Sequence, residues 1–297
     1  MNLRIFSLTL LAIVLLFVGN ASAQNKKFYI FLCFGQSNME GNARIQPQDT
    51  VVDPRLQVLE TVDCSNLKRA KGNWYTAVPP LARCNTGLTP ADYFGRTLIA
   101  TLPSDVTVGI VNVSVAGCKI ELFQKDSYKD YAATAPSWMV NMINEYGGNP
   151  YGHLVEMAKL AQKSGVIKGI LLHQGESNPN DTLWTLKVKG IYDMLLKDLH
   201  LKSKKVPLLA GELVNEDQGG KCAAMNHIID KLPEVISNAY VINSSGCPAA
   251  SDKLHFTAEG YRVLGTRYGL QMLNLLGYKA SATTYPIQVQ TTGNAGR

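Results

Sequence analysis

Ser37 directly follows a segment whose residues suit a nucleophile site. Residues 29–34 are apolar and rich in aromatic side chains, and the run is short enough to be a fully buried strand. The run stops at Gly35, and a strand that ends in Gly-x-Ser directs the hydroxyl out of the sheet edge, where a substrate can reach it. The flanking spacing differs from a lipase-type nucleophile elbow, because Met39 stands where a second glycine would be. A polar turn after a strand is the alternative interpretation.

Asp252 and His255 supply the two further groups that a serine nucleophile needs. A base must take the serine proton, and an acid must orient that base and stabilise its positive charge. The two residues are three apart in one stretch, so a single loop can deliver both. Thr257 is expected to cap a helix over residues 258–276, which would fix the loop. An unrelated surface histidine beside an aspartate is the alternative, but the pairing with Ser37 favours a triad.

Attack by a serine on a carbonyl carbon produces an oxyanion, which needs hydrogen-bond donors placed in advance. The candidates are the backbone N–H groups of Ser37 and Gly117 and the side-chain amide of Gln174. Gly117 follows a predicted strand, where a glycine lets the backbone approach a ligand closely. An ordinary tight turn is the alternative at Gly117, and packing or hydrogen bonding to the loop is the alternative for Gln174.

Glu176 is a carboxylate close to the end of a predicted central strand, residues 166–173. A buried carboxylate without a partner is costly. Glu176 is therefore either a second acid for His255 or a group that forms a salt bridge or hydrogen bond with its loop. His173 is interpreted as a core histidine. The candidates for substrate contact are Gln36, Asn38, Arg83 and Asn178.

The elements that must position these groups alternate along the chain. Strands are expected over residues 29–34, 105–113, 166–173, 204–213 and 240–243, and helices over residues 91–101, 152–164, 182–199, 222–232 and 258–276. This order predicts a three-layer α/β/α sandwich with a central, mostly parallel sheet of about five strands. Every candidate group except Arg83 follows a predicted strand, and ligand sites in such sheets lie beyond the carboxyl ends of the strands. Residues 51–88 lack periodicity and are expected to form a long excursion over the active-site side.

The two ends of the chain differ from the middle in composition. Residues 1–23 contain one basic residue, an apolar run and Ala-Ser-Ala, which is typical of a signal peptide cleaved after Ala23. We therefore expect a secreted or periplasmic protein with no membrane attachment after cleavage. Residues 24–280 are long enough for one domain, and residues 281–297 are expected to be a loose tail. The net charge is +6, but no Lys/Arg stripe interleaved with aromatic residues suggests a nucleic-acid partner.

The chain has six cysteines, an even number that permits disulfides in a secreted protein. We predict the pairs Cys64–Cys84 and Cys222–Cys247, because each brackets a loop-rich stretch. Cys33 and Cys118 are expected to be either free and buried or paired with each other. No Cys-x-x-Cys or histidine-rich spacing suggests a metal site.

Four blocks of the sequence resemble the SGNH-type esterases, and more closely the sialate O-acetylesterase and acetyl xylan esterase branch, carbohydrate esterase family 6. The blocks are residues 35–39, the stretch around Gly117, residues 173–178 and residues 252–256, and residues 72–90 also look like this branch. Gln36 stands where the broader SGNH pattern has aspartate, and Gln174-Gly175-Glu176 replaces a run that supplies an oxyanion asparagine. Gln174 is expected to replace that amide, and Glu176 remains a rival or helper to Asp252.

The resemblance implies removal of acetyl groups from sugar hydroxyls without a metal or organic cofactor. The expected function is a secreted serine esterase that forms an acetyl-enzyme on Ser37 and acts on an acetylated polysaccharide or oligosaccharide, in the first place acetylated xylan. One alternative substrate is O-acetylated sialic acid. An alternative from another class is a carbohydrate-binding protein that has lost catalysis.

Overall fold

The computed structural model describes residues 24–279, and within them it contains a single seven-stranded sheet of order β3-β2-β4-β1-β5-β6-β7. Only β3 runs antiparallel to its neighbour. The strands are β1 (Asn25–Gly35), β2 (Leu56–Leu59), β3 (Trp74–Thr76), β4 (Thr107–Ser114), β5 (Gly165–His173), β6 (Leu208–Gly211) and β7 (Ala239–Ile242). The predicted α/β class with a central, mostly parallel sheet is confirmed.

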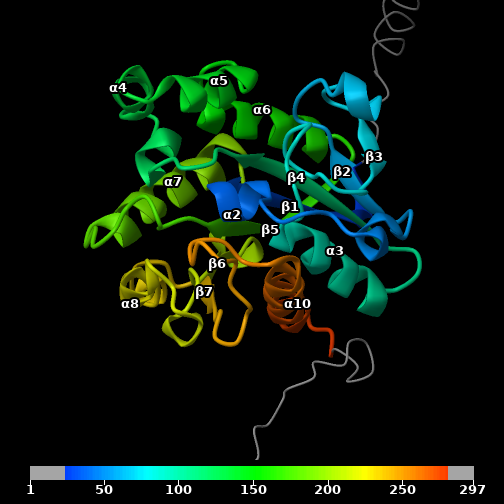
Figure 1. Cartoon of the computed structure of the whole chain (residues 1–297). Coiled ribbons are helices and arrows are strands. Elements are labelled where there is room, and N and C mark those ends of the chain that lie inside the picture. The colour runs from blue at the N-terminus through cyan, green and yellow to red at the C-terminus, as the bar shows by residue number, and fades with distance from the viewer. Residues whose placement is uncertain (1–23, 280–297) are drawn as a thin grey trace, which may run out of the picture.

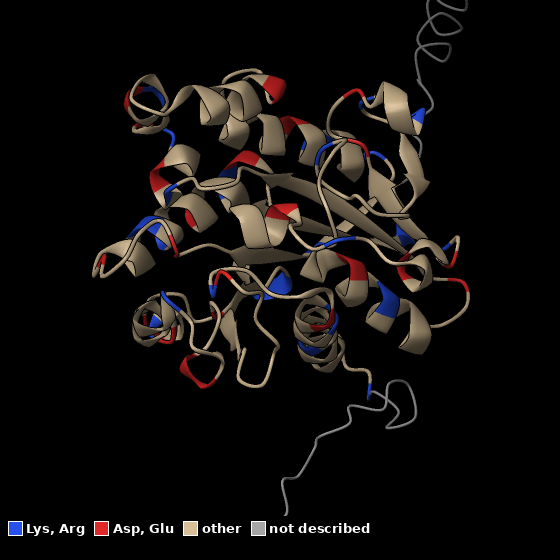
Figure 2. Ribbon diagram, viewed as in Figure 1, with Lys and Arg blue, Asp and Glu red and all other residues tan. Residues whose placement is uncertain are grey.

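Helices cover both faces of this sheet (Figure 1). One face carries α5 (Ser137–Glu145), α6 (Pro150–Gln162) and α7 (Trp184–Asp198), and the other carries α3 (Pro90–Thr101) and α10 (Ala258–Leu275). The shorter helices are α2 (Ser37–Glu40), α4 (Tyr128–Ala133), α8 (Asn226–Ile229) and α9 (Leu232–Val235). Basic and acidic residues are interspersed over these elements in Figure 2.

The side chains of β1 point alternately to the two faces of the sheet, and each set belongs to a separate apolar core. Ile30, Leu32 and Phe34 are fully buried and pack in the cluster that includes α6 and α7. Phe31 and Cys33 are fully buried in the cluster that includes α3 and α10. Successive side chains of a strand point to opposite faces, so a continuous apolar run is what a central strand between two helical layers requires.

The expected elements are present, with shifted ends and two exceptions. The stretch 51–88, expected to have little regular structure, contributes β2 and β3 and so adds two strands to the five predicted. These strands have only 4 and 3 residues, too few to show a period. The helix expected over residues 222–232 is replaced by α8 and α9, and Pro233 lies inside the first turn of α9 rather than ending a helix.

The cysteines bear out one predicted pair and exclude the other. Cys64 and Cys84 form a disulfide that closes the excursion, as predicted. The predicted Cys222–Cys247 bond is wrong, because both thiols are free and they lie against different neighbours, the carbonyl of Glu176 and the guanidinium of Arg267. Two further cysteines are free and buried, which is one of the two alternatives expected for them, namely Cys33 and Cys118.

The predicted signal peptide, residues 1–23, and almost all of the predicted tail, residues 281–297, lie outside the described residues. The limits predicted for the domain stay a prediction. Among residues 24–279 no helix has the length and apolarity needed to cross a membrane.

Candidate active site

The site lies at the carboxyl end of β1, where Ser37 opens α2 (Figure 1). Gly35 ends the strand with φ +151°, and a Cβ there would lie 2.1 Å from the carbonyl oxygen of His173 in β5. Only glycine fits this close approach of two strands. The backbone therefore turns sharply after Gly35, and Ser37 lies at the edge of the sheet.

Ser37, His255 and Asp252 form a continuous hydrogen-bonded chain. The Ser37 hydroxyl and His255 Nε2 are 2.8 Å apart, and His255 Nδ1 is 2.6 Å from Asp252 Oδ2. Because Nδ1–H donates to the carboxylate, Nε2 is the nitrogen left to accept the serine proton. The three groups that the sequence placed 218 and 3 positions apart are thus brought together in a nucleophile–base–acid order.

The loop that carries the acid and the base is held by its own backbone. Asp252 Oδ1 accepts hydrogen bonds from the N–H groups of Leu254 and His255. Thr257 caps α10 by accepting from the N–H of Gly260, as predicted. The imidazole is therefore fixed from both sides, by the carboxylate and by the helix that follows.

The environment of Asp252 favours its charged form. Partial burial alone would raise its pKa, but the hydrogen bonds from the His255 ring and from two backbone N–H groups outweigh burial and lower the pKa to about 2. Asp252 is thus a carboxylate under all ordinary conditions, as an orienting partner for an imidazole must be.

The cleft above Ser37 has a volume of about 320 Å³ and is open to solvent. Its lining residues come from four loops and are Gln36, Ser37, Asn42, Ala116, Gly117, Glu176, Ser177, Leu254 and His255. Within residues 24–279, the backbone N–H groups of Ser37 and Gly117 have no acceptor in the protein. Gly117 has φ +69°, a conformation that glycine adopts without strain. Two free donors therefore lie beside the Ser37 hydroxyl.

Glu176 contacts the site through Asn38 rather than through His255. Its Oε1 accepts from the Asn38 amide, which also donates to the carbonyl of Leu254 at 3.0 Å. Tyr261 in α10 donates to Asn38 Oδ1 at 2.6 Å. Both ring nitrogens of His255 are already occupied by Ser37 and Asp252, so Glu176 has no place as a second acid for the imidazole in this arrangement.

Asn38 therefore joins the serine turn to the histidine loop, and it does not face the cleft. The side chain is fully buried, and both atoms of its amide are hydrogen-bonded inside the protein. The expectation of substrate contact is not supported at this position. Tyr261, which no sequence pattern singles out, completes the junction from α10.

Gln174 belongs to a buried polar network beneath the cleft. Its Nε2 donates to Asn178 Oδ1 at 2.7 Å and to Gln36 Oε1 at 3.1 Å, while its Oε1 accepts from the indole of Trp184 at 2.6 Å. Gln174 is 1% exposed. An amide engaged in this way cannot also receive an oxyanion in the cleft, so the structure does not support the expected oxyanion role and favours the alternative of hydrogen bonding to the loops.

The side-chain amides of Asn178 and Gln36 also direct their oxygens into this buried network. Asn178 Oδ1 accepts from the N–H of Ile120, and its Nδ2 donates to Glu121 and Asp181. Asn178 is absent from the residues that line the cleft, which does not support substrate contact. Gln36 does line the cleft, but its Oε1 is directed to Gln174 and the loop beyond it.

A second polar hollow of about 410 Å³ adjoins the cleft, and Asn42 lines both. Arg83 lines this hollow, but its guanidinium donates to Glu40 at 2.8 Å and to Glu145 at 2.8 Å. The charge expected to face substrate is therefore already neutralised within the protein. Arg44 lines the same hollow, is exposed, and has no ion-pair or hydrogen-bond partner among the described residues.

Asn42 and Arg44 are lining residues outside every predicted block, and no pattern in the sequence singles them out. Ala116 and Ser177 also line the cleft, and they lie within predicted blocks without having been predicted as site residues. Their positions next to Gly117 and Glu176 are the signal that could have found them. Among the described residues no group of three or more His, Cys, Asp or Glu side chains is arranged to hold a metal ion.

Solved structures with this fold include three that cover most of the chain. A protein from Arabidopsis thaliana has a TM-score of 0.62 and 22% sequence identity, over 83% of this chain and 98% of its own. NanS has a TM-score of 0.57 and 13% identity, over 84% and 98% of the two chains. A carbohydrate acetylesterase from Xanthomonas citri has a TM-score of 0.56 and 18% identity, over 83% of this chain and 56% of its own. At these identities the likeness establishes the fold.

The family follows from the sequence itself. Residues 27–274 match the family described as carbohydrate esterase, sialic acid-specific acetylesterase. The match begins within β1 and includes the six other strands, the cleft and the Ser37–His255–Asp252 chain. The protein therefore belongs to the sialic acid-specific acetylesterase family of carbohydrate esterases.

Proposed function

We propose that the protein removes O-acetyl groups from carbohydrate through an acetyl-enzyme on Ser37, and that it is secreted after loss of residues 1–23. The observation that carries this proposal is the hydrogen-bonded chain from Ser37 through His255 to Asp252 at the wall of an open cleft. Within the family, the sequence blocks resemble the branch of SGNH type that contains sialate O-acetylesterases and acetyl xylan esterases.

In the first half-reaction, Ser37 Oγ attacks the acetyl carbonyl carbon while His255 Nε2 takes the hydroxyl proton. Asp252 stabilises the resulting imidazolium through Nδ1–H. The carbonyl electron pair moves to oxygen, and the N–H groups of Ser37 and Gly117 receive that oxyanion. When the pair returns, the bond to the sugar oxygen breaks, and His255 gives its proton to the leaving hydroxyl.

The second half-reaction reverses these roles with water as the nucleophile. His255 takes a proton from water, and the resulting hydroxide attacks the acetyl group on Ser37. The same two N–H groups receive the second oxyanion. Collapse releases acetate and returns the proton to Ser37, so no metal or organic cofactor is needed for the balance.

We propose acetylated xylan as the first substrate. The cleft is open and continues into a polar hollow through Asn42, a shape that accommodates a sugar chain beyond the reacting acetyl group. Arg83, a cation expected to contact substrate, is paired with Glu40 and Glu145. The positive charge of Arg83 is therefore balanced by carboxylates of the protein and is not free to pair with a substrate.

O-acetylated sialic acid is the second candidate, and Arg44 favours it. This exposed guanidinium lines the adjoining hollow without an acidic partner in the described residues and is suited to pair with a sugar carboxylate. The family description points to the same substrate class. The two candidates share the chemistry at Ser37 and differ in whether Arg44 contributes.

Acetate release by the wild type, Ser37→Ala and Arg44→Ala tests both candidates on acetylated xylan and on an O-acetylated sialic acid. We expect Ser37→Ala to lose about 10⁴-fold or more of the rate on any substrate. Loss of rate in Arg44→Ala on the sialic acid alone would assign the second substrate. A wild type that releases no acetate from either compound yet binds sugar would replace the esterase proposal with the binding protein.

A further inference from the structure

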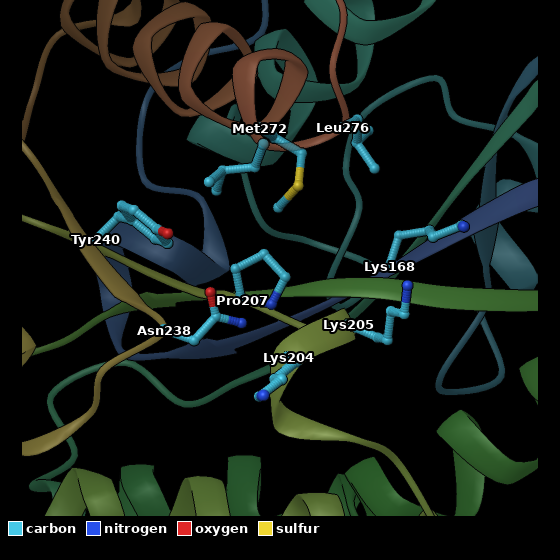
Figure 3. A pocket seen from close by; sticks show the side chains of 9 residues that line it. Lys168, Lys204, Lys205, Pro207, Asn238, Tyr240, Met272 and Leu276 are labelled. Atoms are coloured by element: carbon cyan, nitrogen blue, oxygen red, sulfur yellow. The ribbon is translucent and has the colours of Figure 1, made fainter.

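A second cavity lies at the opposite end of the sheet from the catalytic cleft. It has a volume of about 400 Å³ and is formed where β5, β6 and β7 begin. The side chains that line it, together with the end of α10, are Lys168, Lys204, Lys205, Pro207, Asn238 and Tyr240 (Figure 3). None of these residues takes part in the chemistry proposed at Ser37.

The charge of this cavity is unbalanced. Three lysines line it, and no aspartate or glutamate does. In the described residues none of the three forms an ion pair, although Lys168 lies 4.6 Å from the centre of the Tyr29 ring. Lys187, by contrast, is paired with two carboxylates. Neighbouring ammonium groups repel one another, so an anion between them would be stabilised.

The other lining groups suit a ligand with hydroxyls and a non-polar face. Asn238 donates its Nδ2 to the carbonyl of Ser203, which leaves Oδ1 as an acceptor. The Tyr240 hydroxyl has no partner in the described residues, and its ring is half-buried beside Pro207. Figure 3 shows Lys168 and Lys205 on one side of Pro207 and Tyr240 on the other. Cations, an amide oxygen and a ring face therefore surround one space.

Residues 280–297, which lie beyond the described part of the chain, contain no aspartate or glutamate side chain. A ligand with a carboxylate would balance the charge of the lysines, and membership of a carbohydrate esterase family makes a saccharide the class with hydroxyls and ring faces to match.

We propose that this cavity is a non-catalytic site for an acidic saccharide, with a uronic-acid carboxylate between the lysines and the sugar ring against Tyr240 and Pro207. Its position near the amino ends of the strands separates it from Ser37 by roughly the length of β5, about 20 Å or more. A polysaccharide held here is bound apart from the acetyl group that reacts. The proposal depends on the family and on the cavity, and it does not require Ser37 to be the nucleophile.

The test is a titration of the full chain, by calorimetry and by amide NMR, with a galacturonic acid trisaccharide and with neutral xylotriose. We expect saturable binding of the acidic sugar alone, with the largest shifts at the amides of Asn238 and Tyr240. Lys204→Glu/Lys205→Glu should weaken binding at least about tenfold, because two attractive charges become repulsive. Higher salt should also weaken it.

Lys129→Glu/Lys231→Glu is the matched control, since it makes the same change in net charge at two exposed lysines outside the cavity. Its affinity should equal that of the wild type, and both variants should cleave a small acetyl ester at the wild-type rate. Absence of saturable binding, equal losses in both variants, or shifts confined to the Ser37 cleft would overturn the proposal. So would tighter binding of inorganic phosphate or a short oligonucleotide at the same lysines.

Discussion

Asp252 and Asp92 carry the same side chain in two regions of the molecule, and their pKa values are shifted in opposite directions. Asp252 lies at the cleft, receives hydrogen bonds from an imidazole and two backbone N–H groups, and has its pKa lowered to about 2 despite some burial. Asp92 lies in the first turn of α3, where complete burial raises its pKa to about 7, and one of its oxygens has no partner. Hydrogen bonds at the cleft thus favour the charged carboxylate of Asp252, whereas burial in the second region favours the neutral carboxyl group of Asp92.

The buried region nevertheless supports the cleft. Asp92 accepts from the N–H of Thr89, and the Thr89 hydroxyl donates to the carbonyl of Met39, which also accepts from Asn112. Met39 belongs to α2, the turn that begins with Ser37. Polar groups beneath the cleft thus fix the backbone that carries Ser37. The comparison predicts that changes in the cleft reduce rate, whereas changes beneath it reduce stability.

This comparison predicts its largest effect at Asp252, the proposed acid partner of His255. Asp252→Asn keeps the size of the side chain but removes the charge that stabilises the imidazolium, so acetate release should fall about 10³- to 10⁴-fold with little change in unfolding. Glu176→Gln is the matched control, because its amide oxygen can still accept from Asn38. It should change the rate by less than about tenfold. A larger loss in Glu176→Gln than in Asp252→Asn would reverse the assignment of the acid.

A smaller effect, of another kind, is expected from Gln174→Leu. The change leaves the Trp184 indole N–H without a partner and removes one of the donors to the Asn178 and Gln36 oxygens, and an unsatisfied buried group costs about 1–3 kcal/mol. Urea unfolding should show a loss of at least about 2 kcal/mol, while the rate per folded molecule stays within about tenfold. Gln162→Leu, which loses one bond far from the cleft, provides the control.

The rate in Gln174→Leu decides a question left open by the sequence. Loss of an oxyanion donor costs about 10²- to 10³-fold in rate. A loss of that size with unchanged unfolding would restore Gln174 to the cleft and contradict its place in the buried network.

The three-layer arrangement could be predicted from the sequence, because buried parallel strands and long helices have recognisable patterns of apolar residues. The segments 166–173 and 258–276 match β5 and α10 to within a residue. It missed β2 and β3, whose few residues owe their strand form to the neighbouring β4 and to each other. Such short pairings depend on tertiary contacts and leave no local period.

The site was only partly predictable for a related reason. Ser37, Asp252 and His255 were identified because their chemistry requires one another. Gln174 and Glu176 are two residues apart after the same strand, yet the first is directed into the buried network and the second lines the cleft. The direction of a side chain in an irregular loop depends on the partners around it, here Trp184 and Asn38, which sequence spacing alone does not reveal.

The smallest effect is expected beneath the cleft, and it depends on pH. In the folded protein Asp92 has a pKa near 7, above its unfolded value, so the folded state binds more protons between about pH 4 and 7. Its contribution to stability is complete below pH 4 and is lost as the pH rises through 7. Asp92→Asn has no proton to lose, so its stability relative to wild type should increase by about 2 kcal/mol from pH 5 to pH 8.

Urea unfolding of both proteins at these two pH values measures that difference. Asp193→Asn is the control, because this aspartate lies on the surface of α7, paired with Lys189, and should show no comparable pH dependence. A difference between Asp92→Asn and wild type that is the same at pH 5 and pH 8 would mean that Asp92 is ionised in the folded protein throughout. The two aspartates would then be alike in charge, and the contrast between the cleft and the layer beneath it would rest on hydrogen bonding alone.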